Sequence, residues 1–91
     1  MAKANVYVNK LEINGKEYEI PKALKCSQVI HLEELGVSPL TFEKSPFKTA
    51  IFIAMEITGL DYETILKGFD EMTNVGEVIN ALTNCYISFL A

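Results

Sequence analysis

The stretch Leu11-Glu-Ile-Asn14-Gly15-Lys-Glu-Tyr-Glu-Ile20 decides how the fold begins. Asn-Gly supplies the two positive φ angles of a type I′ turn, and apolar and polar residues alternate on both sides of it. A turn at Asn14 and Gly15 sets the register of a tight β-hairpin. Its pairs are Ile13 with Lys16, Leu11 with Tyr18 and Asn9 with Ile20. One face is then apolar and buried, and it consists of Leu11, Ile13, Tyr18 and Ile20.

The first arm of this hairpin extends toward the N-terminus through residues 5–9. Val6 and Val8 are out of step with the apolar residues of the hairpin, because side chains along a strand alternate between its two faces. The sequence therefore predicts a bulge or break near Asn9-Lys10.

Four helices are expected after the hairpin, each started by a capping residue. They cover residues 28–35, 46–58, 62–71 and 75–91, with Ser27, Ser45, Asp61 and Asn74 as the caps. Residues 37–44 are interpreted as a connector whose apolar side chains turn toward the core. Gly68, inside the third helix, indicates close packing or an early helix end. The prediction is one α+β domain over residues 1–91, with a hairpin in 1–20 and a small helical bundle in 22–91.

Two of these helices carry more apolar surface than a small interior hides. The helix over 46–58 has a polar strip of only Lys48, Thr49 and Glu56, and Phe52 shares that strip. In the last helix no charged side chain occurs from residue 78 to residue 91, although exposed helices normally carry charges. We expect a partner to cover this helix on its second side. The candidate partner-binding residues are Phe52, Ala81, Ile87 and Leu90.

The composition excludes several classes of protein. The 91 residues include eight lysines, no arginine and a net charge of -4, so the cations that grip phosphates are scarce and nucleic-acid binding is not expected. No apolar run approaches the roughly 20 residues that span a bilayer, and the N-terminus lacks the layout of a signal peptide. We expect a cytoplasmic protein that is not secreted and binds no membrane. Cys26 and Cys85 are predicted to be reduced, buried thiols.

The sequence offers little for catalysis. His31 is the only residue whose ordinary pKa lies near neutrality. It lies roughly 140° around a helix from Cys26, so the two cannot form a dyad. His31 and Glu34 share a helical face but make half a metal site at most. No phosphate loop, nucleophile elbow or Cys-x-x-Cys is present, so we predict no enzyme, no cofactor and no metal.

The order of these features resembles the tail assembly chaperones of long-tailed bacteriophages. The resemblance is carried by a strand into Ile13-Asn-Gly-Lys-Glu-Tyr-Glu-Ile20, an acidic helix ending Leu32-Glu-Glu-Leu-Gly36, and an apolar helix closing at Thr58-Gly-Leu60 before Asp61-Tyr-Glu63 opens another. It extends from about Leu11 to the C-terminus.

The resemblance implies a non-enzymatic protein in the cytoplasm of the host bacterium. Such a protein binds the helical, aggregation-prone tape measure protein and helps bring tail tube subunits to it. Members of the family are often made in two forms, the longer by translational frameshifting. The mean hydropathy of +0.19 is high for so small a chain and also predicts self-association. A small homo-oligomeric adaptor or a minor virion protein is therefore the alternative.

Overall fold

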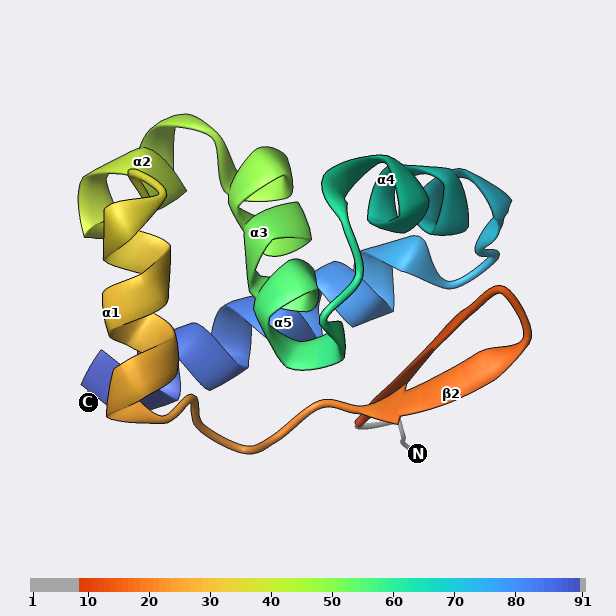
Figure 1. Cartoon of the computed structure of the whole chain (residues 1–91), viewed down its shortest axis with the longest axis horizontal. Helices are drawn as coiled ribbons and strands as arrows, with labels where there is room; N and C mark the ends of the chain where they lie inside the picture. Colours follow the sequence, from red (N-terminus) through yellow and green to blue (C-terminus); the bar gives the residue numbers. More distant parts are fainter. Residues whose placement is uncertain (1–8, 91) are drawn as a thin grey trace, which may run out of the picture.

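A computed structural model of the chain describes residues 9–90 as a β-hairpin followed by five helices (Figure 1). The elements are β1 (Lys10–Ile13), β2 (Lys16–Glu19), α1 (Cys26–Glu34), α2 (Pro39–Lys44), α3 (Pro46–Thr58), α4 (Tyr62–Glu71) and α5 (Val75–Leu90). The predicted α+β class, a two-stranded antiparallel hairpin with helices packed together behind it, is confirmed.

The hairpin has the predicted turn and register. Asn14 and Gly15 adopt φ angles of 54° and 79°, and β1 pairs with β2 in the expected order. The Ile20 amide donates to the Asn9 carbonyl at 2.7 Å, so the pairing continues in step at Asn9. The predicted bulge therefore does not fall between Asn9 and Lys10, and residues 5–8 lie outside the described part of the chain. On the inner face Leu11, Ile13 and Ile20 are buried, and Tyr18 is half-buried.

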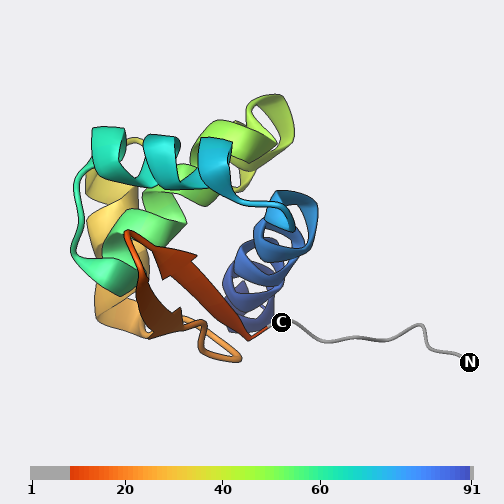
Figure 2. The same ribbon diagram turned by 90° about the vertical axis from the view of Figure 1, so that its right-hand side faces the viewer.

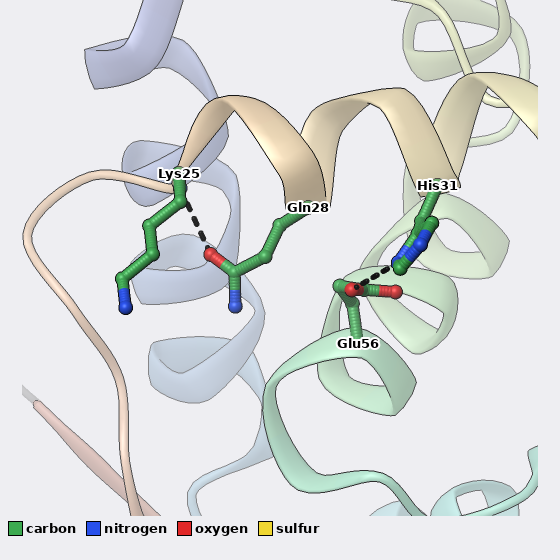
Figure 3. Close-up of polar contacts among 4 residues, drawn as sticks. All are labelled: Lys25, Gln28, His31 and Glu56. Carbon is green, nitrogen blue, oxygen red and sulfur yellow. Dashed lines mark hydrogen bonds and ion pairs between the residues drawn. The ribbon is translucent and has the colours of Figure 1, made fainter.

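Helix α1 begins earlier than predicted. Its N-cap is Lys25, and the Lys25 amide donates to Oε1 of Gln28 at 2.8 Å (Figure 3). Ser27, the predicted cap, lies inside the first turn. The glutamine three residues after the true cap thus accepts from the backbone amide of the cap residue itself, which is the N3 half of a capping box.

The predicted connector over 37–44 contains helix α2, so residues 9–90 hold five helices where four were expected. Ser38 caps it and Pro39 occupies its first position. The Ser38 amide donates to Oγ1 of Thr41 at 2.6 Å, which closes the first turn. Of the connector's apolar side chains Val37 is buried, whereas Leu40 is 70% exposed.

Helix α3 is the central element, and α1, α2, α4, α5 and β2 all pack against it. It begins at Pro46 and ends at Thr58, with Gly59 in the left-handed region, as predicted. Helix α5 passes behind it in Figure 1 and lies along one edge of the molecule in Figure 2. The polar strip predicted for α3 is wrong at Thr49, which does not face solvent. This residue is buried because α2 covers it, and its hydroxyl donates to the Thr41 carbonyl at 3.4 Å.

The hairpin is joined to α4 at Gly68. A Cβ atom at this position would lie 2.4 Å from Cδ1 and 3.2 Å from Cγ2 of Ile13, whose side chain is only 1% exposed. Close packing against Ile13 therefore favours glycine here, which was one of the two predicted explanations.

Gly68→Ala is expected to lower the free energy of unfolding by about 1 kcal/mol. Overpacking costs about 1–3 kcal/mol, and the better helix propensity of alanine offsets about 1 kcal/mol of that. In an Ile13→Val background, which removes Cδ1, the same change should cost less. Urea unfolding of the two single variants and the double variant measures this coupling. Strict additivity of the two substitutions would contradict the proposed contact.

Candidate functional site

The outer face of α5, defined here as Asn80, Thr83, Asn84, Ile87 and Leu90, is open to solvent and uncharged. Ile87 and Leu90 are 50% and 52% exposed, and the polar members are exposed apart from the half-buried Thr83. The opposite side of α5 is in the core through Val78, Leu82, Cys85 and Tyr86. The structure therefore brings two of the predicted partner-binding residues together on one accessible surface.

Ala81 does not belong to this surface. It is 7% exposed and lies one turn before the buried Cys85, about 120° around the helix from Ile87. Its assignment as a partner-binding residue is therefore wrong in this structure. The buried stripe of α5 is wider than we expected from the polar residues on the back face of this helix.

Phe52 lies on a second surface. It is half-buried, with its ring centroid 5.7 Å from that of Tyr62 on α4. It also lines an open hollow of about 230 Å³ between α1, α2 and α3, which we call the Phe52 hollow. Leu35, Val37, Thr41, Lys48 and Thr49 line the same hollow. Sequence reasoning singled out Phe52 but missed the hollow, because α2 forms one of its walls.

A larger hollow, of about 500 Å³, lies between the hairpin and the end of α4, and it is acidic. Glu12, Glu17 and Glu71 line it, and Lys10 approaches Glu17 with 3.8 Å between Nζ and Oε1. Glu12 and Glu17 stand directly opposite each other across the hairpin, a pairing that the predicted register already contained. Within residues 9–90 no three His, Cys, Asp or Glu side chains are grouped so as to hold a metal ion.

His31 joins α1 to α3 through Glu56 and not through the Glu34 on its own helix. Its Nδ1 lies 3.0 Å from Oε1 of Glu56 (Figure 3). The hydrogen bond to Glu56, followed by the negative charge of that residue, raises the pKa of His31 above its ordinary 6.5. Glu34 adds the smallest contribution. The contact is a surface ion pair between two helices.

Replacing Glu56 by glutamine should lower the pKa of His31, because it removes the charge that favours the imidazolium. In the native chain the folded-state pKa is the higher one. The pair therefore stabilises the fold fully below about pH 6.5 and loses this effect as the pH rises through the folded-state value. NMR titration of the imidazole measures this directly, since the chain has one histidine. Glu34→Gln is the control and should shift the pKa less. Equal shifts in the two variants would contradict the assignment.

The two cysteines differ in environment. Cys85 is buried, its thiol donates to the Leu82 carbonyl at 3.1 Å, and burial raises its pKa to about 11. Cys26, predicted to be buried, is exposed; it is the first residue of α1. Both are free thiols.

A thiol reagent such as Ellman's reagent should therefore modify Cys26 rapidly in the folded protein and Cys85 only after unfolding. We expect one reacting thiol in buffer and both in denaturant. Cys26→Ser should abolish the reaction in buffer, and Cys85 should still react in denaturant. Rapid modification of two thiols in native buffer would show that α5 is not packed as described.

Comparison of the chain with protein-family models, with curated proteins and with solved structures returns no match. Across residues 9–90 no helix is long and apolar enough to cross a bilayer. Any functional assignment therefore rests on the surfaces described above and on the order of the sequence features.

Proposed function

We propose that this chain is a non-enzymatic tail assembly chaperone of a long-tailed bacteriophage. In this proposal it binds the tape measure protein and helps recruit tail tube subunits. The observation that carries it is the outer face of α5, on which two large apolar side chains stand half-exposed among uncharged residues. The order of hairpin, acidic helix and apolar helix, which resembles that family, supports the same assignment.

The outer face of α5 suits a helical client. An amphipathic helix presents apolar side chains at a spacing of three and four residues, and Ile87 and Leu90 match that spacing from the other side. Burying the exposed halves of these two side chains stabilises a complex by about 1 kcal/mol each. One such contact is weak, so a single chaperone dissociates readily from its client. Many copies bound along a long client would together cover its apolar surface and still be released, as an assembly factor requires.

A homo-oligomeric adaptor or a minor virion protein is the second candidate, because a second copy would bury the same face. The two functions differ in what they predict. If the chain is a chaperone, the face binds a client, and a polar substitution on it leaves the molecular mass of the client-free protein in solution unchanged. If the chain is a homo-oligomeric adaptor, the same substitution dissociates the oligomer and lowers that mass.

Ile87→Glu and Leu90→Glu should each reduce co-purification with the tape measure protein of the same phage by about tenfold or more, because a charge at this face is desolvated in the complex. Helix content by circular dichroism should stay unchanged, since both side chains are about half-exposed. Leu40→Glu is the matched control, because Leu40 is also an exposed leucine but lies on α2. Unaltered client binding by both α5 variants would refute the proposal. A lower molecular mass of the α5 variants than of the native protein in light scattering would favour the adaptor.

A further inference from the structure

We draw no further inference here: the strongest candidate, the acidic hollow of about 500 Å³ that Glu12, Glu17 and Glu71 line between the hairpin and the end of α4, is a cluster of carboxylates with no second feature that points to a ligand, since no buried side-chain nitrogen or oxygen among residues 9–90 lacks a hydrogen-bond partner.

Discussion

Helix α3 is apolar on nearly every side, and the need to bury it determines where the other elements lie. Ala50, Ile51, Ile53 and Ala54 are almost inaccessible, and four helices and one strand pack around them. A chain of this size has few elements to spare. Helix α5 packs its buried stripe against α3, and no described element is left to cover its other side. The open outer face of α5 is therefore a consequence of how α3 is buried.

The hairpin packs against α4 through a contact that leaves little room for larger side chains. Ile13 enters the space above Gly68, so β1 and α4 approach more closely than two side chains would permit. Register and packing are coupled here, because a slip of one residue along the hairpin would remove Ile13 from the core and place a charged neighbour there. The same register places Glu12 opposite Glu17 on the outer face, where repulsion is tolerated in water. Burial of the inner face thus decides the charge pattern of the outer one.

Local signals predicted the elements well where each signal was complete. The Asn-Gly turn determined the hairpin register, and Ser45-Pro46 with Gly59 determined both ends of α3. Helix α2 carries the same Ser-Pro start, but its six residues are too few to show a helical period. Missing α2 led to two further errors, because α2 covers Thr49 and forms one wall of the Phe52 hollow. Ile87 and Leu90 were found from missing charge, whereas the burial of Ala81 depends on how closely neighbouring elements approach, which no local pattern contains.

The outer face of α5 would be a tolerant surface in the proposed function. None of its five members carries a charge, so it discriminates little among apolar helices and would accept many registers of a long client. Two half-exposed side chains bury far less than the roughly 800 Å² per partner of a stable interface. The contact is therefore small enough to be displaced once subunits assemble around the client.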